Sequence, residues 1–111
     1  MIVNERIVSY IHSLERSNGS LLDEMEAYAK LNRVPIIRKE VESLLKVLLT
    51  MKQPQKVLEL GTAIGYSAIF MSECLNETGK IVTIENYDKR IPIARENIKK
   101  AGDSFLWTIF R

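Results

Sequence analysis

Val-Leu-Glu-Leu-Gly-Thr-Ala-Ile-Gly-Tyr-Ser, residues 57–67, is the stretch that decides the fold of this chain. An apolar run with one acid turns into a loop that carries two glycines and then into a helix. Val57, Leu58 and Leu60 suit a strand that is buried on both faces. Glu59 does not, because a carboxylate among apolar neighbours is costly unless something hydrogen-bonds it. We therefore expect Glu59 to accept from a bound hydroxyl or amine.

The two glycines of this stretch indicate a ligand loop. Gly61 and Gly65 lack a Cβ atom where the chain must turn sharply and where a ligand must approach the backbone. From Tyr66 onward, a helix would supply free N–H groups and a positive dipole end. The spacing Gly-x-x-x-Gly differs from the Gly-x-Gly-x-x-Gly of dinucleotide sites, and the Gly-Lys-Ser/Thr of a P-loop is absent. It suits a ligand with a carboxylate and an amine better than a pyrophosphate.

A second strand and helix follow at a matching distance. Residues 80–85, Lys-Ile-Val-Thr-Ile-Glu, are rich in β-branched types and end in an acid 20 residues past Gly65. Glu85 is thus placed to accept from both hydroxyls of a ribose. With helices expected at 66–76 and 89–101, the pattern predicts an α/β fold, the first βαβα part of a Rossmann-like parallel sheet. The alternative is a tight turn with two solvent-exposed glutamates.

The N-terminal half is expected to be helical. Asn4 is placed to cap a first helix and Ser20 a second, which Pro35 prevents from continuing. A third helix should run from Ile37 and end before Gln53. We expect the apolar stripes of these helices to pack on the sheet, with a lid or an oligomer surface as the alternative.

The glycine stretch, continued by Ala68, resembles the first motif of S-adenosylmethionine-dependent O-methyltransferases. It is similar to the bacterial branch related to catechol and caffeoyl-CoA O-methyltransferases, which includes tRNA 5-hydroxyuridine methyltransferases. Gly-Tyr-Ser at 65–67 is the discriminating part, and Ile-Glu-Asn at 84–86 resembles the acid that ends the second strand of that family. Asn-Arg-Val-Pro-Ile-Ile at 32–37 resembles the segment that closes over the cofactor. The resemblance runs from about residue 1 to residue 102.

The resemblance implies a pocket for S-adenosyl-L-methionine. In it, Ser67 would hold the methionine carboxylate, Glu85 would take the ribose hydroxyls, and Asn86 would sit beside the adenine. Ile37 would cover the methionine end. The cofactor-binding residues expected on this basis are Ile37, Glu59, Gly61, Thr62, Ala63, Gly65, Tyr66, Ser67, Glu85 and Asn86.

The activity implied by the resemblance is methyl transfer to an acceptor hydroxyl on a small molecule or on tRNA. In metal-dependent relatives a divalent cation such as Mg²⁺ orients and acidifies the acceptor, but no metal ligand or catalytic residue is identified here. Where family members often carry Pro-Glu or Gly-Gln after the Ile37 position, this chain has Arg38-Lys39. One alternative is a catalytically inactive cofactor-binding fragment. Another is an NAD-binding dehydrogenase half, which the glycine spacing disfavours.

We divide the chain into an N-terminal helical lid region (1–55), the N-terminal half of a cofactor-binding domain (56–102) and an atypical tail (103–111). Gly102 is a good helix terminator. The tail ends Phe-Leu-Trp-Thr-Ile-Phe-Arg, which favours a strand but does not resemble the family. Full family members are longer and carry further strands. We therefore expect an incomplete sheet in a chain truncated by a frameshift, an early stop or deliberate shortening, and a marginally stable or homodimeric product.

Composition agrees with one globular domain. The apolar content is 46%, and the net charge of +2 is too small to favour nucleic acid. The lone Cys74 excludes an internal disulfide and is expected to pack in the core, and His12 is expected near the surface. Because neither a long apolar stretch nor a signal peptide appears, we predict no membrane contact and a cytoplasmic location.

Overall fold

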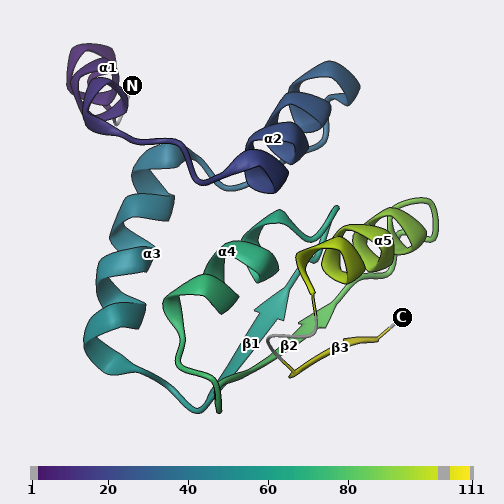
Figure 1. The fold of residues 1–111 in the computed structure, drawn as a ribbon. Coiled ribbons are helices and arrows are strands. Elements are labelled where there is room, and N and C mark those ends of the chain that lie inside the picture. Colours follow the sequence, from purple (N-terminus) through teal and green to yellow (C-terminus); the bar gives the residue numbers. More distant parts are fainter. Residues whose placement is uncertain (1–2, 103–105, 111) are drawn as a thin grey trace.

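The computed structural model of this chain describes residues 3–102 and the backbone of residues 106–110 (Figure 1). The elements in these residues are α1 (Glu5–Leu14), α2 (Ser20–Asn32), α3 (Lys39–Lys52), β1 (Lys56–Leu60), α4 (Tyr66–Cys74), β2 (Lys80–Ile84), α5 (Ile91–Ala101) and β3 (Leu106–Phe110). The three strands are parallel and lie in the order β1-β2-β3. This arrangement is one half of a doubly wound sheet and confirms the predicted α/β class.

The starts of the first two helices test the predicted caps. Asn4 caps α1 as predicted, because its side chain accepts from the backbone N–H groups of Arg6 and Ile7. The cap predicted at Ser20 is wrong. Ser20 is already the first residue of α2, and the cap position is held by Gly19 with a φ of 98° and no side-chain hydrogen bond.

The start of α3 also differs from the prediction, since the helix begins at Lys39 rather than Ile37. The preceding stretch, residues 33–38, is called the lid segment below. Pro35 restricts the backbone before it, and Ile36 and Ile37 pack against the core, so the segment stays non-helical. The helix ends at Lys52 before Gln53, as predicted.

The C-terminal half follows the predicted order with shorter helices. The α4 helix ends at Cys74, two residues before the predicted end, and α5 begins at Ile91, two residues after the predicted start. Gly102 terminates α5 as predicted, with a φ of 91°. The strand expected in the tail is present as β3, and residues 103–105 and 111 of the predicted tail region lie outside the described residues.

The core lies between one face of the sheet and a layer of helices. α4 packs on β2, with α5 at its side, and α2 and α3 pack on α4 (Figure 1). The buried apolar side chains come from α2, the end of α3, the glycine loop, α4, β2 and α5: Leu22, Met25, Ala29, Leu49, Ile64, Tyr66, Ala68, Ile69, Phe70, Met71, Ile81, Ala94 and Ile98. Cys74 packs at the edge of this core, as predicted.

On the other face of the sheet, two large apolar side chains of β1 lie open to solvent. Leu58 and Leu60 of β1 are 65% and 77% exposed, whereas Ile81 on the helix-covered face of β2 is fully buried. The prediction that β1 is buried on both faces is therefore wrong for this chain. The physical reason is that both crossovers of the parallel unit place their helices on the same side of the sheet.

The apolar stripe of α3 is also largely exposed. Leu44 and Leu48 are more than half exposed, because α3 contacts α4 through Leu45 and Leu49 and does not lie on the sheet. The expectation that this stripe packs on the sheet is wrong.

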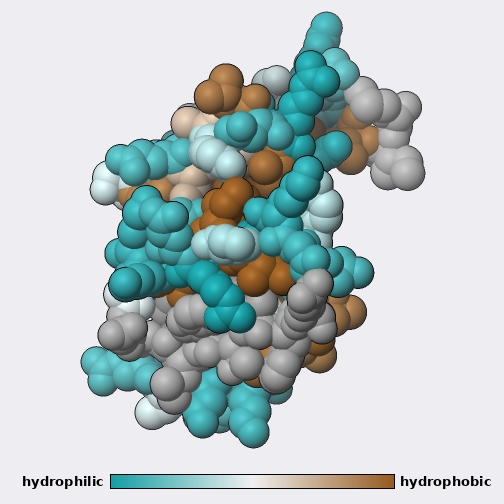
Figure 2. Space-filling view, turned by 90° about the vertical axis from the view of Figure 1, so that its right-hand side faces the viewer, coloured by the Kyte–Doolittle hydropathy of each residue, from teal (hydrophilic) through white to brown (hydrophobic). Residues whose placement is uncertain are grey.

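The face of the molecule that carries α2 and α5 is more polar than the exposed stripe of α3. Figure 2 shows this face largely hydrophilic, with apolar side chains visible in between. Among the described residues, no helix is long and apolar enough to span a bilayer.

We expect the open sheet face to bind a fluorescent dye for apolar surfaces, because contiguous exposed leucines attract such probes. Replacing Leu58→Glu and Leu60→Lys together should reduce the dye signal several-fold. The thermal midpoint should change little, since both side chains already lie in solvent. The measurement is made at protein concentrations where the chain is monomeric. Unchanged dye binding there, or a large fall in midpoint, would show that these leucines are covered within a single chain.

Candidate functional site

The loop after β1, residues 61–65, is fixed to the end of β2. The backbone N–H groups of Gly61 and Thr62 both donate to the carbonyl oxygen of Ile84, at 2.8 and 3.2 Å. Gly61 has a φ of 93°, and Ala63 lies in the left-handed region at 48°. A non-glycine residue in that region is uncommon and strained, so the surrounding hydrogen bonds must hold it there.

Gly65 is required for a second reason, the close approach of the loop to α5. Its φ is 90°, and a Cβ atom at this position would lie 3.3 Å from the side chain of Ile98 and 3.5 Å from the carbonyl oxygen of Ala94. From the same helix, the Asn97 side-chain amide donates to the Ile64 carbonyl at 2.9 Å. The sequence analysis did not identify Asn97. The sequence feature that could have identified Asn97 is a polar residue beside Ala94 and Ile98, on the inner side of an amphipathic helix.

Glu85 organises the loop from the end of β2. Its side chain is nearly buried, and one carboxylate oxygen accepts from the Ala63 N–H at 2.8 Å. The other oxygen accepts from the N–H groups of Asn86 and Tyr87, both at 3.1 Å. A carboxylate has about four acceptor positions, so capacity remains for a further donor. Asn86 is exposed directly beside it.

Glu59 also finds partners within the chain. One carboxylate oxygen accepts from the Thr83 hydroxyl at 2.7 Å, and the other accepts from the Ser67 hydroxyl. The Thr83 hydroxyl is also 2.7 Å from that of Thr62, so a buried chain of hydroxyls joins β1, β2 and the loop. The structure thus pairs Glu59 and Ser67, which the sequence analysis assigned separately to ligand groups.

The environment of Glu59 makes its ionised form more costly than that of an exposed carboxyl. Burial raises the pKa of this carboxyl above its ordinary value, and hydrogen bonds from Ser67 and Thr83 offset only part of that effect. The nearby Glu85 carboxylate raises the pKa further. The two acids therefore repel each other across the loop, and a ligand that donates to either one would relieve this cost.

The start of α4 faces the same space. Gly65 occupies the cap position and no side chain caps the helix, so the first-turn N–H groups from Tyr66 onward are open to an anion. A cavity of about 250 Å³ lies between Pro35, Ile36 and Ile37 of the lid segment and Gly61, Thr62, Ala63, Tyr66 and Ser67. The structure therefore brings Ile37 to the loop across one cavity.

These features fit an amino acid joined to a nucleoside. Open helix N–H groups suit a carboxylate, Glu59 suits an amine, and the remaining acceptor capacity of Glu85 suits a hydroxyl. Within the described part of the chain, no group of three or more His, Cys, Asp and Glu side chains is placed to hold a metal ion.

His12 lies at the surface, as predicted, and does not join this site. Its imidazole is 2.8 Å from the Glu40 carboxylate and about half exposed.

The raised pKa of Glu59 predicts a pH-dependent stability difference for Glu59→Gln. A carboxyl with a raised folded-state pKa stabilises the fold below its unfolded pKa, and this contribution is lost as pH rises through the folded value. The variant should therefore unfold at a higher temperature than the wild type near pH 7. The gap should close toward pH 4, and thermal unfolding at several pH values measures it. A variant that is less stable near pH 7 would contradict the assignment.

Comparison with known proteins gives concordant matches. The catechol O-methyltransferase of Niastella koreensis is 40% identical over 58 residues, covering 52% of this chain and 26% of that protein. The protein-L-isoaspartate O-methyltransferase of Methanococcoides burtonii is 37% identical over 57 residues, covering 51% and 28%. The crystal structure of the O-methyltransferase from Bacillus cereus in complex with SAH superposes with a TM-score of 0.79 at 25% identity, covering 95% of this chain and 49% of that one.

The chain therefore spans about a quarter of the curated relatives named above and about half of the superposed structure. The O-methyltransferase family itself is matched over residues 12–105, which is most of the chain. Fold and family match agree, and the chain belongs to the S-adenosylmethionine-dependent O-methyltransferase family.

Proposed function

We propose that this chain binds S-adenosyl-L-methionine and serves in methyl transfer to an acceptor hydroxyl. The observation that carries the proposal is the meeting of Glu59, Glu85 and the open start of α4 around one loop, under the lid segment. When bound, S-adenosylmethionine supplies an activated methyl group, and the protein supplies orientation.

Each part of the site has a role in this proposal. The first-turn N–H groups of α4, that of Ser67 among them, hold the methionine carboxylate, while the Ser67 hydroxyl stays on Glu59 and Glu59 meets the amine. Glu85 accepts from the ribose hydroxyls with its remaining acceptor capacity, and Asn86 lies beside the adenine. Ile37 closes the methionine end from the lid segment. Residues 1–55 act as the lid region and residues 56–102 as the cofactor-binding half.

Calorimetric titration with S-adenosylhomocysteine and, separately, with NAD tests the ligand class. We expect heat from the first and none from the second, because the loop offers few N–H groups for a pyrophosphate. Binding of NAD with no binding of S-adenosylhomocysteine would contradict the proposal and indicate the NAD-binding half of a dehydrogenase instead.

Glu85→Ala tests the site itself. Loss of hydrogen bonds to a charged group costs about 2 kcal/mol, so the affinity for S-adenosylhomocysteine should fall about thirtyfold or more. Helix content by circular dichroism should be unchanged. Glu96→Ala is the matched control, since that exposed acid on α5 pairs only with Lys100 at 3.4 Å among the ion pairs of the described residues. Equal affinity in both variants would refute the ribose role.

A second candidate function is a cofactor-binding fragment without transfer activity. The observation that favours it is coverage, since the Bacillus cereus structure extends well beyond the part this chain matches. A methyl-transfer assay with radiolabelled S-adenosylmethionine separates the two, using catechols, acyl-CoA thioesters and tRNA as acceptors. Binding without transfer on any acceptor would favour the fragment, and dependence of transfer on added Mg²⁺ would indicate a metal-assisted reaction.

A homodimer through the open sheet is part of the proposal. The free edge of β1 and the exposed side chains of Leu58 and Leu60 offer a surface that a second copy could cover. Sedimentation over a range of concentrations should show association of the wild type. The Leu58→Glu, Leu60→Lys variant should remain monomeric.

A further inference from the structure

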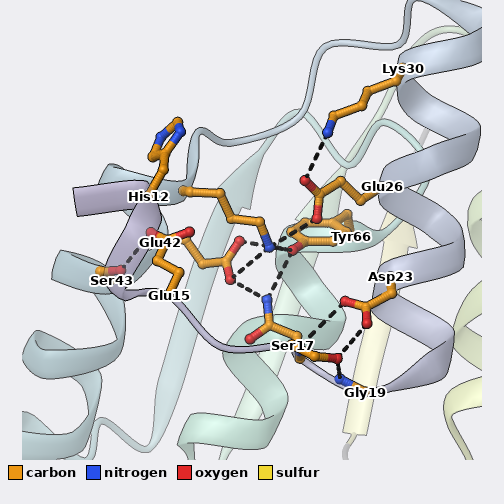
Figure 3. Close-up of polar contacts among 12 residues, drawn as sticks. His12, Glu15, Ser17, Gly19, Asp23, Glu26, Lys30, Glu42, Ser43 and Tyr66 are labelled. Atoms are coloured by element: carbon orange, nitrogen blue, oxygen red, sulfur yellow. Dashed lines mark hydrogen bonds and ion pairs between the residues drawn. The ribbon is translucent and has the colours of Figure 1, made fainter. Parts of the chain in front are cut away.

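A buried polar network links the helices on either side of the lid segment to the first residue of α4. The Tyr66 side chain is only 1% exposed, and its hydroxyl donates to the Glu42 carboxylate at 2.8 Å (Figure 3). The same hydroxyl accepts from the Lys39 ammonium and from the Asn18 side-chain amide, both at 3.2 Å. The Asn18 amide also donates to Glu42. One hydroxyl thus joins the α1–α2 connection, α3 and α4.

Lys39 occupies a special place in this network, because it is the residue that follows the lid segment. Its ammonium is 2.9 Å from the Glu26 carboxylate of α2 and 3.6 Å from that of Glu42. It also lies 5.8 Å from the centre of the Tyr66 ring. Since α2 precedes the lid segment and α3 follows it, Lys39 ties the two helices that flank the lid to the residue that opens α4.

The protonation states of Lys39 and Tyr66 are fixed near neutral pH. Burial would lower the pKa of Lys39, but hydrogen bonds to Glu26 and Tyr66 and the charge of Glu42 raise it above its ordinary value. Burial and the Glu42 carboxylate raise the pKa of Tyr66 to about 12. Lys39 is therefore an ammonium and Tyr66 a neutral phenol, which can donate to one group while accepting from another.

The geometry points to Lys39 as a positioning residue for the methionine half of the cofactor. Tyr66 and Ile37 both line the cavity between lid and loop, and Lys39 joins Tyr66 to the end of the lid. Removing this tie would let the lid segment move away from the loop. Glu85, by contrast, lies on the sheet side of the loop and takes no part in the network. The inference rests on the proposed function for the identity of the ligand.

Lys39→Met is the test variant, because methionine keeps most of the side-chain length but removes the charge and the donors. Lys30→Met is its matched control. Lys30 contacts the same Glu26 carboxylate at 3.4 Å, yet its side chain is 78% exposed and it does not reach Tyr66. The ligands are S-adenosylhomocysteine, which has the methionine half, and adenosine, which lacks it.

We expect Lys39→Met to lower the affinity for S-adenosylhomocysteine about tenfold and the affinity for adenosine less than about twofold. The tenfold change corresponds to the loss of one hydrogen bond to a charged group. Lys30→Met should leave both affinities unchanged. Without any ligand, hydrogen exchange at the Val34 amide, which donates to the Ala29 carbonyl oxygen at 2.9 Å, should be about tenfold faster in Lys39→Met than in Lys30→Met. Lys39→Arg should restore part of the affinity.

Several results would overturn the inference. Equal exchange rates in the two variants would do so, as would unchanged affinity for S-adenosylhomocysteine in Lys39→Met. An equal loss for adenosine would mean general destabilisation rather than positioning. If the wild type binds no S-adenosylhomocysteine, the proposed function fails, and the exchange rates still decide whether Lys39 holds the lid. Should Lys39→Met not fold, Tyr66→Phe removes only the shared hydroxyl and should give the same pattern.

Discussion

The rest of the loop depends on the hydrogen bonds that the carboxylate of Glu85 accepts. Ala63 is held in the left-handed region, which costs an L-residue about 1 kcal/mol, and its N–H donates to Glu85. A charged acceptor makes a stronger bond than a neutral one, about 2 kcal/mol against about 1. Glu85 can therefore hold the strained turn by itself. Because its other oxygen accepts from Asn86 and Tyr87, the same acid also sets how the chain leaves β2.

A carboxylate with three internal donors is not free to reorganise when a ligand arrives. The orientation of the Glu85 carboxylate is already fixed, because the backbone N–H groups that donate to it limit its rotation. Glu59 is held in a comparable way by Thr83 and Ser67. Preorganised acceptors lose little entropy on binding, which is how a small site reaches useful affinity. Holding the Glu59 carboxylate in this buried position has a free-energy cost. The cost appears in the pKa of Glu59, which burial and the Glu85 charge raise together.

Sequence reasoning predicted the elements that depend on local signals. The Asn4 cap, the end of α3 before Gln53 and the termination at Gly102 follow from side-chain capping and from positive φ angles. The strand pattern brought attention to Glu59 and Glu85 but not to their internal partners. Those partners depend on the register of β1 against β2, which sets Glu59 opposite Thr83. The cap predicted at Ser20 is wrong because Gly19 holds the cap position, with a positive φ angle that serine rarely adopts.

Tertiary contacts explain the remaining misses. Glu42 lies in the run Lys-Glu-Val-Glu-Ser, which reads as a solvated helix face, and nothing local marks it as buried. It is buried because Tyr66, 24 residues away, brings a hydroxyl to it. The exposed leucines of α3 show the converse. Their spacing predicts a buried stripe, but burial needs a surface to pack on. In this chain Leu45 and Leu49 reach the core, whereas Leu44 and Leu48 do not.

The uncovered sheet face and the candidate site lie on different parts of the fold, and this separation matters for what the chain can do. The open face carries Leu58 and Leu60, whose side chains alternate with Glu59 along β1. Since neighbouring strand residues point to opposite faces, Glu59 is turned toward α4 and the loop while the leucines are turned away. The expected cofactor residues run from Ile37 to Asn86 and use the helix-covered face and the carboxyl ends of β1 and β2. The described residues of the candidate site thus lie apart from the open face, and covering that face would change stability before it changed their contacts.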